Sequence, residues 1–319
     1  MNEKETNIII TRIEQWYSRL QGMFVEDRQS LHAEYSWSKN PVPFANRLDK
    51  KYKSITKDKS WGKEWDSAWF RLTGKRKKEW KGKTIVADLD FSGEGLVYDP
   101  NGNEIQGITN ASIWDQNFVR TRVIIPKTCF KKDDVEFWVE TAANSLFGIY
   151  VDTDPDQDSP KRHGTFDAKV VTIDIGIFRK DIWDLYLDAR ILIGLIKRLD
   201  KKSVRRARII DTMNNAVVAF KDDKKDAEAS RKILSKELNK KATSSDLKAA
   251  AVGHAHIDTG WLWPVKETIR KCARTFATQL DLIDRYPDYI FGASMPQHYQ
   301  FMKDHYPKIF KRIKAAVKK

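Results

Sequence analysis

The sequence has few cysteines and no long apolar segment, and both shortages exclude whole classes of protein. Its 319 residues include only Cys129 and Cys272, which lie far apart and form no Cys-x-x-Cys pair. Neither a disulfide framework nor a thiolate zinc site is therefore indicated. No run of about 18 apolar residues is present, so no membrane-spanning helix is expected. The polar residues that follow Met1 do not form a signal peptide, and the sequence predicts a soluble cytoplasmic protein.

Acidic residues are fewer than basic ones, 44 against 58, which gives a formal net charge of +14. Such an excess can serve an anionic partner such as a nucleic acid. Here the basic residues are spread along the chain, and no zinc-finger, basic-zipper or RNA-recognition pattern is present. We therefore expect a solvated basic surface, with neither a nucleic acid nor a membrane as partner. A hydrophobic content of 41% with eleven tryptophans is typical of a globular protein, and the length has room for about two domains.

Short strands separated by turn signals are predicted in the first half of the chain. The segment Thr84–Phe91 places apolar residues on one face and Asp88 and Asp90 on the other, the pattern of a half-buried antiparallel strand. Residues 1–54 are expected to contain an N-terminal helix and a connecting segment, since no clear periodicity follows the helix. Residues 55–177 are expected to form an antiparallel β-sandwich of the jelly-roll type.

The second half of the chain is predicted to be mostly helical. Apolar residues at helical spacing run through residues 178–245, which are expected to form a helical linker. Residues 246–319 then alternate between predicted strands and helices, starting with a small buried strand at 247–253 and a helix from Glu267. This order predicts the opening β/α units of a truncated α/β barrel, because only two strands are present. The predicted fold class is therefore multidomain.

Two histidines and an aspartate follow the strand at 247–253, at positions His254, His256 and Asp258. In an extended chain, residues two apart point to the same side, so two imidazoles and a carboxylate would converge. Nitrogen and oxygen ligands of this kind suit Zn²⁺. The same residues could instead cap the helix that follows. The His-x-His spacing also opens the metal site of amidohydrolases, so spacing alone does not choose a chemistry.

Two tryptophans come directly after this cluster, Trp261 and Trp263. An indole beside a metal offers an apolar face on which a sugar ring can stack, although buried indoles more often fill a core. We assign the sugar-binding role to Trp261 and a core role to Trp263.

The segment Ala251–Pro264 reads Ala-Val-Gly-His-Ala-His-Ile-Asp-Thr-Gly-Trp-Leu-Trp-Pro. Together with Glu267-Thr-Ile-Arg-Lys271, it resembles the entry to the catalytic domain of glycoside hydrolase family 38, the α-mannosidases, in the cytosolic/vacuolar-type branch. Upstream, the segments Gly93–Asp99 and Asn144–Gly148 are similar to the N-terminal sandwich of that branch. The resemblance runs over nearly the whole chain.

The resemblance implies a zinc-assisted retaining hydrolase that removes terminal α-linked mannose from oligosaccharides. It implies that His256 and Asp258 are zinc ligands and that Trp261 lines the mannose subsite. His254 matches a family position without an implied zinc bond, and we expect it to orient the ligands. The nucleophile is expected beyond Lys319, so no catalytic residue is assigned within the chain. We therefore expect an N-terminal fragment that is inactive alone, with a homo-oligomer or a complementing C-terminal polypeptide open as partners.

One short segment departs from the pattern of the branch. The chain has Ser294-Met-Pro-Gln-His-Tyr299 where the branch usually has Ser-Gln-Ala-Gln-Gln-Tyr. His298 therefore stands at a position where the branch has glutamine.

Two other functions remain open from the residues. A non-catalytic carbohydrate-binding β-sandwich could use exposed aromatic residues such as Trp65, Trp80 or Trp114 to stack on sugars. We favour the alternative that these tryptophans fill the sandwich core or a domain interface. A different metal hydrolase, such as an amidohydrolase, could use the His-x-His pair. The Trp-Leu-Trp-Pro continuation and the preceding sandwich and helices disfavour the amidohydrolase.

Overall fold

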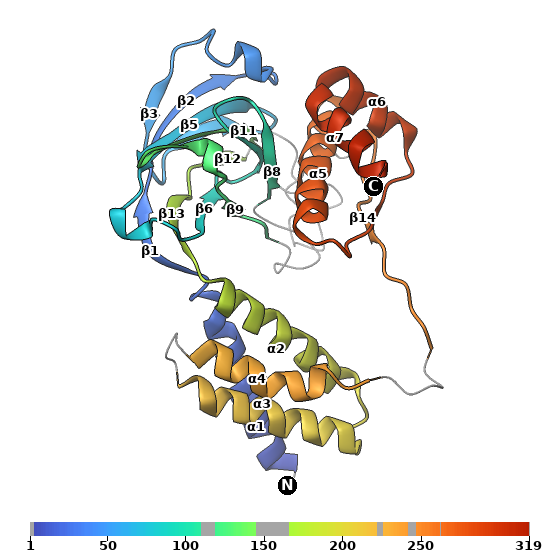
Figure 1. The fold of residues 1–319 in the computed structure, drawn as a ribbon. Coiled ribbons are helices and arrows are strands. Elements are labelled where there is room, and N and C mark those ends of the chain that lie inside the picture. The colour runs from blue at the N-terminus through green and yellow to red at the C-terminus, as the bar shows by residue number, and fades with distance from the viewer. Residues whose placement is uncertain are drawn as a thin grey trace, which may run out of the picture. The chain divides into compact units, whose positions relative to one another are not determined.

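The structure is a computed structural model, and Figure 1 shows its ribbon. It describes residues 3–109, 119–144, 166–221, 226–241, 247–261 and 263–318. The chain divides into two compact units, the first Met1–Asp27 with Gly176–Ala249 and the second Arg28–Ile175 with Ala250–Lys319. Both units combine segments that are far apart in the sequence.

The first unit is helical. Its described residues form α1 (Glu3–Gln21), α2 (Lys180–Arg198), α3 (Val204–Phe220) and α4 (Ala227–Leu238). Helix α1 packs on α2 and α3, and α4 packs on the same two helices. Tyr17 of α1 stacks on Tyr186 of α2 with ring centroids 4.4 Å apart, and Trp16 meets Phe220 edge to face. The helical periodicity predicted for this part of the chain is confirmed.

The beginning of α3 follows the rules of helix capping. Ser203 precedes the helix, and its hydroxyl accepts a hydrogen bond from the backbone N–H of Arg206. This contact satisfies one of the amide groups that a helix start leaves unpaired. In the described part of the chain, no helix is both long enough and apolar enough to cross a membrane.

The second unit begins with a β-sandwich. One sheet has the order β1-β13-β6-β9, and a larger one has the order β3-β2-β5-β11-β7-β8, with β10 also on β11. Two further strands, β4 and β12, pair with each other. The strands span β1 (Val25–Ser30), β2 (His32–Ser38), β3 (Lys53–Ile55), β4 (Ser60–Lys63), β5 (Ser67–Lys75), β6 (Ile85–Asp90), β7 (Glu94–Tyr98), β8 (Glu104–Ile108), β9 (Arg122–Ile124), β10 (Phe130–Lys131), β11 (Asp134–Ala142), β12 (Asp167–Lys169) and β13 (Thr172–Phe178).

The sandwich core is aromatic. Phe70 of β5 packs against Phe91, directly after β6, with ring centroids 4.4 Å apart, and Trp61 of β4 meets Phe70 edge to face. Strand β5 pairs antiparallel with both β2 and β11, and β6 pairs antiparallel with β9. The antiparallel jelly-roll architecture expected from the sequence is confirmed.

The connecting segment expected within residues 1–54 is corrected by the structure. Strands β1, β2 and β3 fill much of it, and β2 lies inside the larger sheet between β3 and β5. The buried residues of β2 include Ala33, Ser36 and Ser38. Ala33 lies on one face of the strand and Ser36 and Ser38 on the other. Burial of small and polar residues on both faces hides the alternation of hydrophobic residues by which a strand is usually predicted.

The small buried strand expected at 247–253 is also corrected. Only Gly253 and His254 form a strand, β14, and the side chain of Leu247 is 99% exposed. Strand β14 pairs in parallel with β15 (Phe291–Gly292), and α5 (Val265–Arg285) connects the two. Two helices follow, α6 (Pro296–His305) and α7 (Pro307–Val317). The predicted β–α–β–α order is therefore present, with shorter strands than expected.

Helices α5, α6 and α7 gather beside the larger sheet of the sandwich (Figure 1). One continuous apolar cluster joins the sheet to these helices, and its buried members are Trp69, Leu96, Tyr98, Trp138, Cys272, Ala273, Phe276, Ala277, Leu280, Met302, Ile309 and Ile313. Cys272 lies in this cluster, and both cysteines are buried and free. The opening of the α/β part thus shares a core with the sandwich.

A buried group of charges lies in the same contact. We call it the α5 ion cluster, and its members are Glu94, Glu140, Glu267, Arg270, Lys271 and Arg274. The three carboxylates and three cations balance in charge. Arg274 contacts Glu94 at 2.7 Å, and Lys271 contacts the same carboxylate at 2.9 Å.

The helix also approaches the sheet closely at Gly107 of β8. The backbone N–H of Gly107 donates to the hydroxyl of Thr278, 3.0 Å away. A Cβ atom at Gly107 would lie 2.8 Å from the backbone oxygen of Arg274. Glycine is therefore required for this approach of strand to helix.

The charge balance of the α5 ion cluster generates a stability prediction. Glu94→Gln removes one carboxylate and leaves Lys271 and Arg274 short of a partner, so we expect a loss of about 3–5 kcal/mol in the free energy of unfolding. Urea denaturation measures it. The matched control is Glu136→Gln, which removes a carboxylate from the exposed pair with Arg71 and should cost no more than about 1 kcal/mol.

The same carboxylate predicts a dependence on pH. Burial alone would raise the pKa of Glu94, but Lys271 and Arg274 more than offset it and lower this pKa to about 2. The stabilisation is therefore complete above the ordinary glutamate pKa of 4.5 and is lost as the pH falls from there towards 2. The Glu94→Gln variant should show a shallower loss of stability over this interval. An equal slope in both proteins would contradict this role of Glu94.

Candidate functional site

The candidate site lies where the short parallel sheet passes into a helix. Strand β14 ends at His254, α5 begins at Val265, and the loop between them carries the predicted site residues. The carboxyl ends of parallel strands are where α/β folds place their ligand and catalytic groups. Pro264 precedes α5, with a fixed φ angle that suits a helix start.

The structure brings His256 and Asp258 together. The ring nitrogen Nε2 of His256 lies 3.2 Å from Oδ1 of Asp258, and their side chains are 82% and 39% exposed. Two ligands held at about 2.1 Å from a tetrahedral ion are roughly 3.4 Å apart, close to the spacing seen here. The spacing fits two positions of one zinc site and equally fits a direct hydrogen bond between the imidazole and the carboxylate, and both side chains are open to solvent.

The described residues supply no more of such a site than this pair. No group of three or more His, Cys, Asp or Glu side chains that could hold a metal occurs in the part of the chain that the structure describes. His254 is exposed and pairs with Gly292 in the parallel sheet. Its expected role in orienting the ligands stays a prediction.

The two tryptophans of the loop have different surroundings. The side chain of Trp261 is 57% exposed, and its ring meets Trp263 edge to face with centroids 5.6 Å apart. Trp263 is half-buried, with the ammonium group of Lys271 4.5 Å from its ring centroid. Trp261 thus exposes much of its indole to solvent on the loop that carries His256 and Asp258, and it packs against Trp263.

Sequence reasoning missed the buried hydroxyl of Thr268 in α5. It accepts hydrogen bonds from the backbone N–H of Gly260 and from the indole N–H of Trp263, each 3.0 Å long. It also donates to the backbone carbonyl of Asp258 at 3.3 Å. A polar residue in the first turns of an amphipathic helix, facing the loop before it, was the available signal.

A second contact holds the loop from α6. Nε2 of His298 lies 3.2 Å from the hydroxyl of Thr259, and His298 is buried. Burial lowers the pKa of His298 below its ordinary value of 6.5, because the charged imidazolium loses its hydration. The residue that departs from the pattern of the branch therefore contacts the candidate site loop.

Two family models match the chain. The model described as "Alpha-mannosidase, jelly roll domain" matches residues 28–172, and the model described as "Glycosyl hydrolases family 38 N-terminal domain" matches residues 246–319. The chain thus contains an α-mannosidase jelly-roll domain and a segment that matches the family 38 N-terminal domain. The range matched by the jelly-roll model includes strands β2 and β3, which also belong to the larger sheet of the sandwich in the structure.

Curated family 38 relatives match over most of the chain. Alpha-mannosidase G of Dictyostelium discoideum is 29% identical over 98% of this chain, and Alpha-mannosidase 2C1 of Homo sapiens is 28% identical over 85%. Alpha-mannosidase of Saccharomyces cerevisiae is 26% identical over 87% of the chain. The chain spans only 29%, 25% and 26% of the lengths of these three relatives.

Among solved structures, the chain is similar to a b-glucuronidase from Ruminococcus gnavus. The TM-score is 0.35 at 13% identity, over 47% of this chain and 29% of that one. A likeness this slight bears on neither the fold nor the function of this chain.

The structure gives little support to sugar binding by the tryptophans of the sandwich. Trp80 is completely buried and cannot stack on a sugar, in agreement with the expectation that it fills the core. Trp65 is half-buried, and Trp114 lies outside the described residues.

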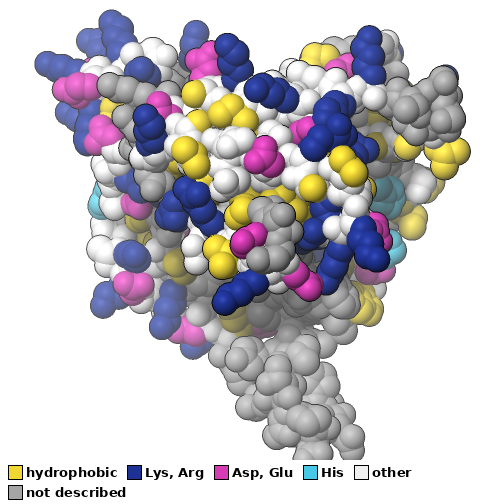
Figure 2. Space-filling model, turned by 90° about the horizontal axis from the view of Figure 1, so that it is seen from below, with side chains coloured by type: hydrophobic (Ala, Val, Ile, Leu, Met, Phe, Trp, Pro, Cys, Tyr) yellow, Lys and Arg dark blue, Asp and Glu magenta, His cyan; other side chains and the backbone are white. Residues whose placement is uncertain are grey.

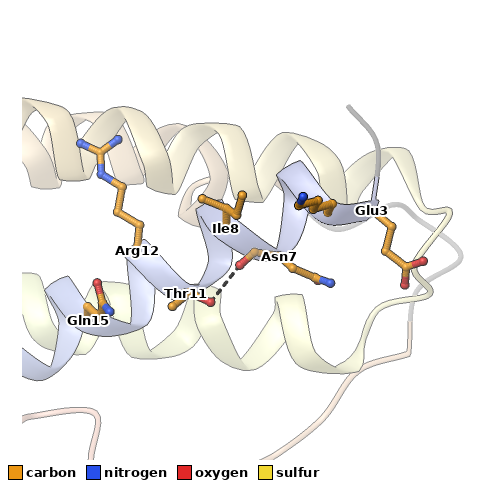
Figure 3. Close-up of a pocket in the computed structure, with 7 residues that line it drawn as sticks. Glu3, Asn7, Ile8, Thr11, Arg12 and Gln15 are labelled. Carbon is orange, nitrogen blue, oxygen red and sulfur yellow. Dashed lines mark hydrogen bonds between the residues drawn. The ribbon is translucent and has the colours of Figure 1, made fainter.

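An open hollow of about 780 Å³ lies on the helical unit (Figure 3). All of its lining residues come from α1, namely Glu3, Lys4, Asn7, Ile8, Thr11, Arg12 and Gln15. Residues from a single helix do not enclose a ligand, unlike the concave sites that small molecules use.

Charged side chains of both signs are scattered over the face shown in Figure 2. Lysine and arginine are interleaved there with aspartate and glutamate. The predicted lack of a nucleic-acid partner stays a prediction.

His298 generates the prediction for this site. Because its pKa is lowered in the folded state, the unfolded chain takes up a proton first as the pH falls. The free energy of unfolding should therefore be undiminished above about pH 6.5 and should decrease below it. His298→Gln, which removes the titrating ring, should flatten this decrease, while His305→Gln on the exposed part of α6 should not. NMR titration of the His298 ring with a midpoint at or above 6.5 would contradict the prediction.

Proposed function

We propose that the loop between β14 and α5 is part of the zinc and mannose site of a family 38 α-mannosidase. The observation that carries the proposal is the solvent-open pair of His256 and Asp258, with donor atoms 3.2 Å apart. The exposed indole of Trp261 on the same loop adds a surface that suits the apolar face of a sugar. The proposed reaction is retaining hydrolysis of terminal α-linked mannose in oligosaccharides.

His256 and Asp258 would hold the zinc ion, His256 as a neutral imidazole and Asp258 as a carboxylate. When bound, zinc supplies a Lewis acid that polarises and positions sugar hydroxyl groups. Trp261 orients the sugar ring by stacking. Retention of configuration also requires two carboxyl groups about 5–5.5 Å apart. We assign none of the described carboxylates to the role of nucleophile.

We further propose that the chain alone binds zinc weakly and does not turn over mannosides. Its described residues offer two donors, whereas catalytic zinc sites use three protein ligands. The remaining ligands and the nucleophile would come from a complementing C-terminal polypeptide, because a second copy of the described residues would offer only the same two donors. The cytoplasmic location expected from the sequence stays a prediction.

Zinc titration by calorimetry tests the proposed ligands. We expect His256→Ala and Asp258→Asn each to weaken zinc binding at least about tenfold. Losing a residue that only orients a ligand weakens metal binding about tenfold or more, and losing the ligand itself should weaken it at least as much. The control is His305→Ala, an exposed histidine of α6, which should bind zinc as the unmodified chain does. Equal zinc affinity in all four proteins would exclude His256 and Asp258 as ligands.

Hydrolysis of an aryl α-mannoside tests the second proposal. The chain should show no release of the aryl group above the buffer rate, with or without zinc. Turnover at the usual enzymatic rate of about 1 s⁻¹ or faster would show that the described residues suffice for catalysis.

A further inference from the structure

We infer that Thr268 is a positioning residue that holds the described part of the site loop, residues 258–261 and 263, in the arrangement that presents Asp258 and Trp261. The consequence for zinc rests on the proposed function, whereas the effect on the loop does not. The residue lies on the buried side of α5 and has no exposed surface. It is therefore in contact with neither zinc nor sugar, and it acts through the loop.

The hydroxyl of Thr268 is used to its full capacity. A hydroxyl can donate one hydrogen bond and accept two. Here it donates to the carbonyl of Asp258 and accepts from the backbone of Gly260 and the indole of Trp263. One oxygen atom thus contacts the loop near its beginning, middle and end.

Each of these bonds bears on a predicted site residue. The bond to the carbonyl of Asp258 fixes the backbone from which the candidate ligand projects. The bond to Trp263 fixes the ring against which Trp261 packs, with an angle of 83° between the ring planes. Gly260, between them, has a φ of +74°, a left-handed conformation that glycine adopts at no steric cost. The hydroxyl therefore stabilises a sharp turn at Gly260. This turn lies between the candidate zinc ligand Asp258 and the candidate sugar-binding residue Trp261.

Thr268 can fix the loop because its own helix is fixed. Its neighbours Glu267 and Arg270 belong to the α5 ion cluster, in which they contact each other and the larger sheet. Other groups also contact the loop. Thr259 contacts His298, the N–H of Trp261 donates to the carbonyl of Trp263 at 3.3 Å, and the ammonium group of Lys271 lies 4.5 Å from the ring centroid of Trp263.

Thr268→Val separates the hydroxyl from the shape of the side chain. Valine has the same branching but cannot pair with Gly260 or Trp263, and a buried donor without a partner is unfavourable. The loop is exposed enough to move so that both groups reach water. Thr268→Ser keeps the hydroxyl and loses only a methyl group, so it should rescue the loop.

Hydrogen exchange of the unmodified chain and its variants, followed by NMR, tests the inference. We expect the amide of Gly260 and the indole N–H of Trp263 to exchange at least about tenfold faster in Thr268→Val than in the unmodified chain or Thr268→Ser. The matched control is Thr278→Val on the same helix. That hydroxyl pairs with Gly107 and the carbonyl of Arg274, so its loss should accelerate exchange at Gly107 and leave the loop unchanged.

Three results would overturn the inference. The first is unprotected exchange of the Gly260 amide and the Trp263 indole N–H in the unmodified chain. This measurement does not depend on the folding of any variant. The second is unchanged protection of these groups in Thr268→Val, and the third is loss of protection in Thr268→Ser. If Thr268→Val does not fold, Thr268→Ala replaces it and is judged by the same criteria.

Zinc titration of the same variants separates this inference from the proposed function. We expect Thr268→Val to weaken zinc binding about tenfold or more, with Thr268→Ser and Thr278→Val unchanged. If the unmodified chain binds no zinc, the proposed function fails, while the exchange measurement still decides the role of Thr268. If zinc binding is present and equal in all variants, Thr268 does not position the ligand.

Discussion

The contact between α5 and the larger sheet depends on charges that are taken out of water. Arg270, Arg274 and Glu267 are nearly inaccessible to solvent, and each lies against a charge of opposite sign. Removing such groups from water is costly, and the cost is offset only when every charge has a close partner in good geometry. A helix displaced or turned by one residue would lose these partners together. The ion cluster therefore selects one register of α5 on the sheet, while the surrounding apolar cluster supplies most of the favourable energy.

This constraint gives the jelly roll a structural part in the candidate site. Glu94 and Glu140 come from the sandwich, while Arg270 and Arg274 come from the helix that follows the site loop. The close approach at Gly107 adds a steric condition to the electrostatic one. The sandwich thus supports the helix, and the helix supports the loop. Trp80 of the sandwich is completely buried and is not available for sugar binding.

How much of the fold could be predicted depended on where apolar residues lie in the sequence. Helices with a regular apolar stripe, such as α2, and strands with clear alternation, such as β6, were predicted well because burial and periodicity coincide there. Strand β2 was missed because its buried positions lie on both faces and two of them are Ser36 and Ser38. Residues 247–252 were taken for a buried strand because they are small and apolar, yet composition cannot show whether a partner strand is present.

The candidate site was also predictable only in part. The spacing of His256 and Asp258 makes a metal site one of the functions that the sequence predicts, because few side chains serve as ligands and their pattern is short. The supporting residues carry no such pattern. A threonine or an arginine in a helix is ordinarily exposed, and only the folded chain shows that Thr268 and Arg274 face inward. Nevertheless, the candidate ligands His256 and Asp258 and the supporting residue Thr268 lie in one continuous stretch of the chain, from β14 into α5. The order of residues along the chain thus places the chemical groups on the loop and the groups that hold them on the first turns of the next helix.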